Sequence, residues 1–454
     1  MNDVIKRFTK KDQVQDISKV NKIPCKSIND ILRPINILNN IFGLRICIFP
    51  QSRRRPLLSF LYSLTICCLH YLGSLYRDTK FDCIRVYHLD EILCHAVTFL
   101  SHLMLCLILI MGLYQSESSR LCAKKINDID KTLKKLGSPS YFNDIYKRTI
   151  TYITITVSYI GIFFAMIILT EILRNEPINR SSILYYSMFL HIYGYIIENL
   201  LVMEFVTIVR CINSEFQRAN ELLGDVNVLP IRSTELKLIE VKKRGDYFSK
   251  EKSLSPDGDQ LFSDVSSLSS QTQSQLQIAS QKISRSKMLL RTIRQVHLEL
   301  YKVSKSLSTI YGIQISLEMA ACVILTTYII YRSYEKYQKK HIDDYEMFYQ
   351  YFILIMLLLQ YSTKIFIIDY TCDKTTKQAE RTSEIIHTFY GLNTDLEIKE
   401  EVDIFSLQMM QCRTTYSAFG FYNLNCKHIC SCIGIITTYM VIIIQVTDSI
   451  KYGS

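Results

Sequence analysis

Seven stretches of the chain are apolar for about twenty residues each, and polar, charged segments separate them. A helix rises 1.5 Å per residue, so about twenty residues cross the roughly 30 Å hydrocarbon layer of a bilayer. The pattern therefore predicts an all-α membrane protein in which residues 1–454 form a single seven-helix domain. The predicted transmembrane helices run approximately over residues 56–76, 91–114, 149–173, 182–206, 306–331, 348–369 and 427–447.

The segments between the spans differ in composition. Residues 1–55 are polar and basic, and we expect a cytoplasmic N-terminal segment there. Residues 245–283 are rich in Ser and Gln and poor in aromatic residues, which predicts a disordered cytoplasmic loop.

Two further segments carry apolar residues at helical spacing on otherwise charged helices. Such apolar seams predict cytoplasmic helical extensions of the membrane helices. Two interpretations fit: packing within one chain, or contacts between subunits. One seam comprises Cys122, Ile126, Ile129, Leu133 and Leu136, and the other comprises Leu289, Ile293, Val296, Leu300, Val303 and Leu307.

The distribution of positive charge predicts the orientation of the chain. Of the 53 Lys and Arg residues, 41 lie in the N-terminal segment and in every second loop, and 10 lie in the remaining loops and the C-terminal tail. The positive-inside rule then places the N-terminus in the cytoplasm and the C-terminus outside, as in a multi-pass plasma-membrane protein. This topology is opposite to that of a G-protein-coupled receptor. The net charge of +11 is spread over loops, so we expect the lipid bilayer and no nucleic acid as a partner.

The sequence lacks the signatures of common enzymes. It contains no Gly-rich phosphate loop, no H-E-x-x-H and no G-x-S-x-G. The run CKHICSC at 426–432 places its possible ligands two residues apart, which fits no zinc pattern. We therefore expect no enzyme activity, no cofactor and no metal site.

Polar side chains on three spans predict a charge-compensated network in the inner half of the membrane. Glu198 lies on the fourth span, Glu318 on the fifth, and Gln360 and Lys364 lie one turn apart on the sixth. An unpaired charge at that depth is costly, so we expect Lys364 to pair with Glu318. A structural clamp and an ion path are the two interpretations.

The outer half is neutral and rich in hydroxyl and aromatic groups. On the second span His95, Thr98 and His102 share one helical face. With polar and aromatic residues of three other spans they predict a pocket open to the outside that orients a small neutral ligand. For each single residue, an interfacial position or a hydrogen bond between helices is the alternative. The other residues of this set are Tyr186, His191, Tyr193, Thr326, Thr327, Tyr328, Tyr349 and Gln350.

The last span carries a narrow polar stripe. On an ideal helix the residues Ser431, Thr438, Gln445 and Ser449 fall within about 40° of one another. The stripe faces either another helix or a water-filled axis.

Motifs in the last third of the chain resemble those of insect gustatory receptors. TYMVIIIQV at 438–446 is similar to the TYhhhhhQF motif (h, apolar) of that family's last span, with Val446 in place of Phe. SAFGFYNLNCKHIC at 417–430 resembles the segment before that motif, and residues 294–320 resemble the approach to the family's fifth span. The resemblance extends to the fructose-receptor branch and to a neighbouring branch.

The resemblance implies a ligand-gated, non-selective cation channel assembled as a homo- or hetero-tetramer, with a small-molecule tastant bound in the outer halves of the second to sixth spans. It also implies that the last helix lines the pore, with Thr438, Tyr439, Ile442, Gln445 and Val446 as pore and gate residues. A metabotropic receptor acting through a cytoplasmic partner is the alternative. A transporter ranks third, since the sequence shows no internal repeat.

Overall fold

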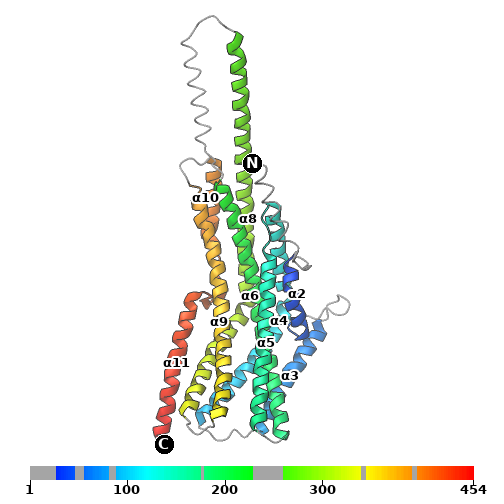
Figure 1. Ribbon diagram of the computed structural model, residues 1–454, viewed down its shortest axis with the longest axis vertical. Coiled ribbons are helices and arrows are strands. Elements are labelled where there is room, and N and C mark those ends of the chain that lie inside the picture. The colour runs from blue at the N-terminus through cyan, green and yellow to red at the C-terminus, as the bar shows by residue number, and fades with distance from the viewer. Residues whose placement is uncertain are drawn as a thin grey trace, which may run out of the picture.

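The computed structural model describes residues 27–45, 56–80, 88–174, 178–228, 259–338, 344–390 and 396–453. Among these residues, seven helices are long and apolar enough to cross a membrane (Figure 1). Each predicted transmembrane stretch lies on a different one, which confirms an all-helical chain with seven candidate spans. These helices are α3 (Pro56–Lys80), α4 (His88–Lys135), α5 (Phe142–Arg174), α6 (Ile178–Val228), α8 (Asp259–Gln338), α9 (Asp344–His387) and α11 (Cys426–Gly453).

Helices α4, α6, α8 and α9 are longer than a bilayer requires and continue together beyond their apolar stretches (Figure 1). Both predicted seams are buried in this region: Ile126 and Leu133 on α4, and Ile293 and Leu300 on α8, have no exposed surface. Helices α4 and α8 contact each other. The seams therefore pack within one chain, the first of the two interpretations.

The structure differs from the sequence-based prediction at the start of α8. The helix begins at Asp259, so residues 259–283 are helical where a disordered loop was predicted, while residues 245–258 lie outside the described part. Between 259 and 338 the chain contains no Pro and a single Gly, Gly312, so no residue in this polar stretch breaks a helix.

The segment predicted as a polar N-terminal region contains a helix that packs into the bundle. Helix α2 (Ile28–Ile41) begins with a capping box in which Ser27 N donates to Asp30 Oδ2 at 3.0 Å. It packs against α4, α5 and α6. With 14 residues it is too short to register as a span. Its buried apolar residues Ile28, Ile31, Leu32 and Ile35 follow helical spacing.

The chain after α2 also enters the bundle. A Cβ at Gly112 on α4 would fall 2.7 Å from the carbonyl oxygen of Leu44, so a glycine is required for this close approach.

A short hairpin precedes the last helix. Helix α10 (Leu396–Gln411) is followed by β1 (Ser417–Ala418) and β2 (Tyr422–Asn423), which pair antiparallel. The turn between the strands contains Phe419 and Gly420 in the left-handed region, with φ of 52° and 82°. A Cβ at Gly312 would fall 3.1 Å from Phe419 N, so the hairpin lies directly on α8. Helix α11 then runs along the edge of the bundle beside α9 (Figure 1).

Candidate functional site: the last helix, the polar clusters and the ligand pocket

Helix α11 is attached to its neighbours near both ends. At its start, His428 Nδ1 lies 2.8 Å from Asp369 Oδ2 on α9, and the imidazole stacks on Tyr422 with ring centroids 4.3 Å apart. Near its end, Thr447 Oγ1 donates to the hydroxyl of Tyr331 on α8 at 3.3 Å. The two attachments hold the helix against α8 and α9 and leave the part between them largely uncovered.

The polar stripe of α11 does not pack against any other helix that the structure describes. Ser431, Thr438, Gln445 and Ser449 are all exposed. The three hydroxyls donate to carbonyl oxygens four residues earlier in the helix, at 2.8–3.3 Å. The amide of Gln445 makes no hydrogen bond within the described residues. Packing of the stripe against the described part of the subunit is therefore excluded, while its role in a pore stays a prediction.

The other predicted pore residues are also uncovered. Tyr439, Ile442 and Val446 expose 57%, 46% and 43% of their surfaces. This side of α11 is thus apolar apart from the stripe. Within one subunit, nothing in the described chain occludes it.

A buried cluster joins three helices around Lys364. Its Nζ donates to Glu318 Oε1 on α8, the partner expected from the sequence, and to Glu198 Oε2 on α6, both at 2.8 Å. The Lys364 and Glu318 side chains are 2% and 1% exposed. Such enclosure, with α6, α8 and α9 joined at one point, favours the structural clamp, and the choice between clamp and ion path stays a prediction.

The fourth predicted member of that network has a different partner. Gln360 accepts a hydrogen bond from the Tyr159 hydroxyl on α5 at 3.4 Å, and its Nε2 is buried without a partner in the described residues. Lys364 Nζ also lies 5.4 Å from the ring centroid of Tyr361 and 5.8 Å from that of Tyr195. The lysine is thus surrounded by two carboxylates and two aromatic faces.

A second buried cluster was not predicted from the sequence. Arg45 pairs with Glu204 on α6 and donates to the Tyr311 hydroxyl on α8 at 2.9 Å. Asn39 Nδ2 donates to the other oxygen of Glu204 at 2.8 Å, and Ser119 on α4 donates to Glu204 Oε1 at 3.0 Å. An acid within a predicted span, such as Glu204, indicates that a cationic partner is needed. The sequence did not identify Arg45 as that partner, because Arg45 lies outside every predicted span.

A third cluster holds together the helical extensions. Arg218 on α6 is fully buried and pairs with Asp130 on α4 at 2.7 Å and with Glu215 at 2.6 Å. It also donates to the side chain and carbonyl of Ser138. The extension layer is therefore fixed by charge pairing as well as by the apolar seams.

The residues predicted to line the ligand pocket contact different neighbours. His102 Nδ1 contacts the carbonyl oxygen of Thr98, and its ring lies edge-on to His70 with centroids 4.4 Å apart. The Tyr193 hydroxyl donates to the carbonyl oxygen of Phe42 at 2.7 Å.

The pocket residues of the fifth and sixth spans have local partners. Thr327 Oγ1 donates to the Val323 carbonyl at 2.9 Å, and Gln350 accepts from Lys336 Nζ at 2.7 Å. His95 is exposed, while Tyr328 and Tyr349 are half-buried. The side chains of Tyr186 and His191 lie outside the described part. The described contacts do not gather the predicted residues into one group, so this pocket stays a prediction.

Two atoms of the predicted set nevertheless stand out. The hydroxyl of Thr326 and Nε2 of His102 are buried and have no hydrogen-bond partner among the described residues. Buried polar groups of this kind are uncommon in native structures, and a bound ligand is one way to satisfy them.

Comparison with solved structures identifies the fold. The insect olfactory receptor OR5 from Machilis hrabei superposes with a TM-score of 0.54 in complex with eugenol and 0.55 in a second structure. Each comparison covers 92% of this chain and 98% of the receptor chain, at 13% sequence identity. At this identity the match shows the fold.

Sequence comparison identifies relatives over part of the chain. Putative gustatory receptor 28b of Drosophila melanogaster is 29% identical over 77 residues, or 17% of this chain and 16% of that receptor. The gustatory receptor for bitter taste 66a of the same fly is 27% identical over 157 residues, or 34% of this chain and 30% of that receptor. The chain thus aligns with less than a third of either relative.

The family as a whole matches nearly the full chain. The family described as 7tm Chemosensory receptor covers residues 32–450, which include every candidate span. Its members are receptors and not enzymes. The chain belongs to the 7tm chemosensory receptor family.

Proposed function

We propose that this receptor is a gustatory receptor subunit that forms a tastant-gated, non-selective cation channel in the plasma membrane. The observation that carries the proposal is the exposed, unbonded amide of Gln445 within the polar stripe of α11. An amide carries two N–H donors and one acceptor oxygen, and leaving them unsatisfied in hydrocarbon is costly. A water-filled axis shared by several copies of α11 satisfies them.

The number of subunits rests on the family resemblance, which implies a tetramer. In this arrangement Thr438 and Gln445 face the axis, and Ile442 and Val446 form the apolar constriction beside them, with Tyr439 at its inner side. A hydrophobic constriction gates by excluding water, and an adjacent polar group eases the passage of ions.

The charge distribution supports a cytoplasmic N-terminus and an extracellular C-terminus, which puts both Thr326 and His102 in the outer halves of their helices, on the side from which the ligand approaches. Sugars are included among the ligands by the resemblance to the fructose-receptor branch. Bitter compounds are included because one relative is a receptor for bitter taste. A small organic tastant is the ligand class proposed.

Electrical recording from cells that express this chain alone tests the channel function. We expect a tastant from a panel of sugars, bitter compounds and amino acids to evoke a cation current that survives block of G-protein signalling. Epitope tags at both ends, stained before and after permeabilisation, check surface delivery and topology. A current that disappears with G-protein block would instead support the metabotropic alternative.

Two adjacent threonines offer a matched test of the ligand site. The Thr326 hydroxyl has no partner, while that of Thr327 is bonded to its own helix. If a ligand accepts or donates a hydrogen bond at Thr326, Thr326→Val costs about 1–3 kcal/mol, or roughly five- to a hundredfold in half-maximal tastant concentration. Thr327→Val is the comparison: its hydroxyl already donates to the Val323 carbonyl, so we expect a smaller shift than for Thr326→Val. Equal responses of both variants and the wild type would remove Thr326 from the ligand site.

A further inference from the structure

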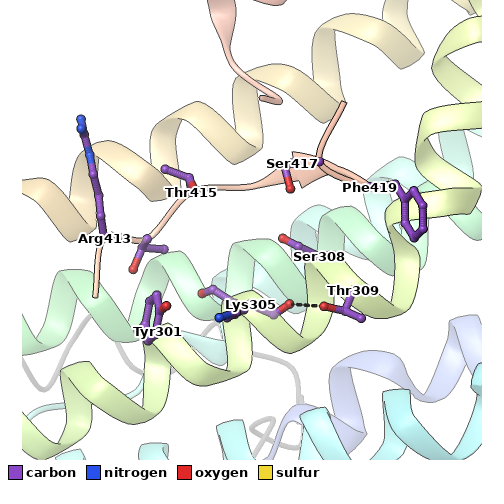
Figure 2. Close-up of a pocket in the computed structure, with 11 residues that line it drawn as sticks. Tyr301, Lys305, Ser308, Thr309, Arg413, Thr415, Ser417 and Phe419 are labelled. Atoms are coloured by element: carbon purple, nitrogen blue, oxygen red, sulfur yellow. Dashed lines mark hydrogen bonds between the residues drawn. The ribbon is translucent and has the colours of Figure 1, made fainter. Parts of the chain in front are cut away.

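A polar cavity lies between α8 and the segment that joins α10 to α11 (Figure 2). Its volume is about 360 Å³, within the roughly 300–1,000 Å³ range of small-molecule sites. Among the described residues, six hydroxyl-bearing Ser and Thr residues line it, together with Tyr301, Lys305 and Arg413, and no carboxylate does. The six are Ser304, Ser308, Thr309, Thr414, Thr415 and Ser417. The lining therefore offers donors and positive charge.

Two of these hydroxyls are buried and unsatisfied. Thr414 is 4% exposed, and its Oγ1 has no hydrogen-bond partner among the described residues. The Oγ of Ser308 is likewise buried without a partner. Figure 2 shows Ser308 and Ser417 facing each other across the cavity from α8 and from the joining segment. Buried hydroxyls without partners, on residues that line a cavity, fit a ligand that supplies acceptors.

The charge of the cavity is also available for a ligand. Lys305 makes no ion pair within the described residues. Arg413 extends from the joining segment toward α9, where it donates to Glu380 Oε1 at 2.8 Å (Figure 2). Lys305 is thus the uncompensated cation of the lining, and Arg413 is a partly compensated one at the rim.

The wall of the cavity is held in a fixed shape. The Tyr416 hydroxyl donates to Ser304 Oγ at 3.2 Å, and burial raises the pKa of Tyr416 above its usual value, so the phenol remains a donor. Because Gly312 has no side chain, the turn at Phe419 lies directly against α8. A Cβ at Gly312 would lie 3.1 Å from Phe419 N. The hydroxyls of the joining segment therefore lie on a loop that is held in place, and this lowers the conformational entropy lost on binding.

We propose that this cavity binds a phosphate group, with Lys305 as the ion-pair partner and the hydroxyls of Ser308 and Thr414 as hydrogen-bond donors. Phosphate oxygens are acceptors for lysine and for Ser and Thr hydroxyls, and the absence of a carboxylate from the lining removes the main repulsion. On the proposed topology the cavity lies at the cytoplasmic end of the fifth span. The phosphate comes from a phosphoinositide headgroup of the inner leaflet or from a soluble phosphorylated compound.

Hydrogen–deuterium exchange of the full-length receptor in phosphatidylcholine nanodiscs distinguishes the two sources. One arm adds phosphatidylinositol 4,5-bisphosphate to the nanodisc lipid, and the other adds inositol 1,4,5-trisphosphate to the buffer. We expect slower exchange in peptides covering residues 301–309 and 413–420 in at least one arm. Protection by the lipid alone assigns a membrane headgroup, and protection in both arms assigns a site open to soluble phosphates.

Two variants test whether the protection arises in the cavity. Lys305→Gln removes the free cation, and Thr414→Val replaces an unpartnered hydroxyl with an isosteric methyl, a change that leaves the fold intact. Each is expected to raise the half-saturating probe concentration about tenfold or more.

Lys302→Gln and Thr292→Val are the matched controls on the same helix. Lys302 is paired with Glu299, and Thr292 donates to its own helix at the Met288 carbonyl. We expect both to bind the probes as the wild type does. The proposal is overturned if neither probe slows exchange in these peptides, or if Lys305→Gln and Thr414→Val both bind with unchanged affinity. Because no step depends on an ion current, the result is independent of the channel function proposed above.

Discussion

Helices α5 and α11 are covered to the same small extent by the rest of the chain. In each, 6% of the most apolar stretch is buried, against 67% in α6 and 56% in α8. Both carry several exposed hydroxyl groups. Exposure within one subunit therefore does not separate a lipid-facing helix from a pore-lining one.

The polar groups on the uncovered faces do separate them. On α5, Thr151 and Thr154 donate to the carbonyls of Lys147 and Ile150, and residues 149–166 contain no amide or charged side chain. A helix of this kind is satisfied in lipid without any partner. On α11, Gln445 cannot satisfy all its donors on its own helix and makes no bond in the described chain. An unsatisfied amide, rather than low burial, distinguishes the candidate pore helix.

In the covered helices the polar groups are buried and paired with one another. Lys364→Ala tests the importance of this pairing and has the largest expected effect. The substitution leaves Glu198 and Glu318 buried without their shared cation, which costs about 3–5 kcal/mol. We expect a lower melting temperature in detergent and a strong loss of surface delivery.

A neutral replacement of the whole cluster is the control for that variant. Lys364→Met combined with Glu198→Gln and Glu318→Gln removes the charges together, and we expect it to recover most of the lost stability. If Lys364→Ala unfolds at the wild-type temperature, the cluster is not a clamp, and the ion-path interpretation gains.

The next prediction concerns the uncovered amide itself. Gln445→Arg would place four cations around the proposed axis, each repelling a permeant cation by roughly 0.8 kcal/mol at about 5 Å in a water-like dielectric. The total of about 3 kcal/mol reduces cation conductance on the order of a hundredfold. Whole-cell currents, normalised to surface protein, measure it.

Gln445→Glu is the control, because it introduces a charge of similar size and opposite sign at the same place. It is expected to maintain or raise cation conductance. If Gln445 faces lipid or protein instead, both charges disturb the helix alike. Equal losses in the two variants would therefore assign α11 to the same class as α5.

The sequence predicted the features that depend on local pattern. Apolar length located the seven spans, and the spacing of Leu300 and Ile126 with their neighbours located the extension layer. The pairing of Lys364 with Glu318 followed from depth and charge alone. Each of these needs only the helical period and the cost of an unpaired charge.

The features that depend on tertiary arrangement were not predicted. Helix α2 is too short to register as a span, so Arg45 was not connected with Glu204. The cavity at Thr414 forms because the hairpin before α11 packs against α8. The spacing of residues along the sequence does not predict this contact. The predicted tastant set depends on how each helix is rotated about its axis. Tyr193 illustrates this, since its hydroxyl bonds to Phe42.

The smallest predicted effect concerns the contact that attaches the end of α11 to α8, beside the proposed gate. The Thr447 hydroxyl is shared between the Ile443 carbonyl at 2.8 Å and the Tyr331 hydroxyl at 3.3 Å in a buried site next to Val446, so the contact with Tyr331 holds the helix beside the constriction. Tyr331→Phe keeps the ring and removes the acceptor, which costs about 1 kcal/mol in the conformation that makes the bond. If that conformation is the closed one, the half-maximal tastant concentration falls about fivefold, and if it is the open one it rises by the same factor. Dose–response curves read the sign directly, with Tyr337→Phe as the control because Tyr337 lies on the same helix and is 78% exposed. A Tyr331→Phe curve that coincides with the wild type would show that the end of α11 does not change its contact with α8 during gating.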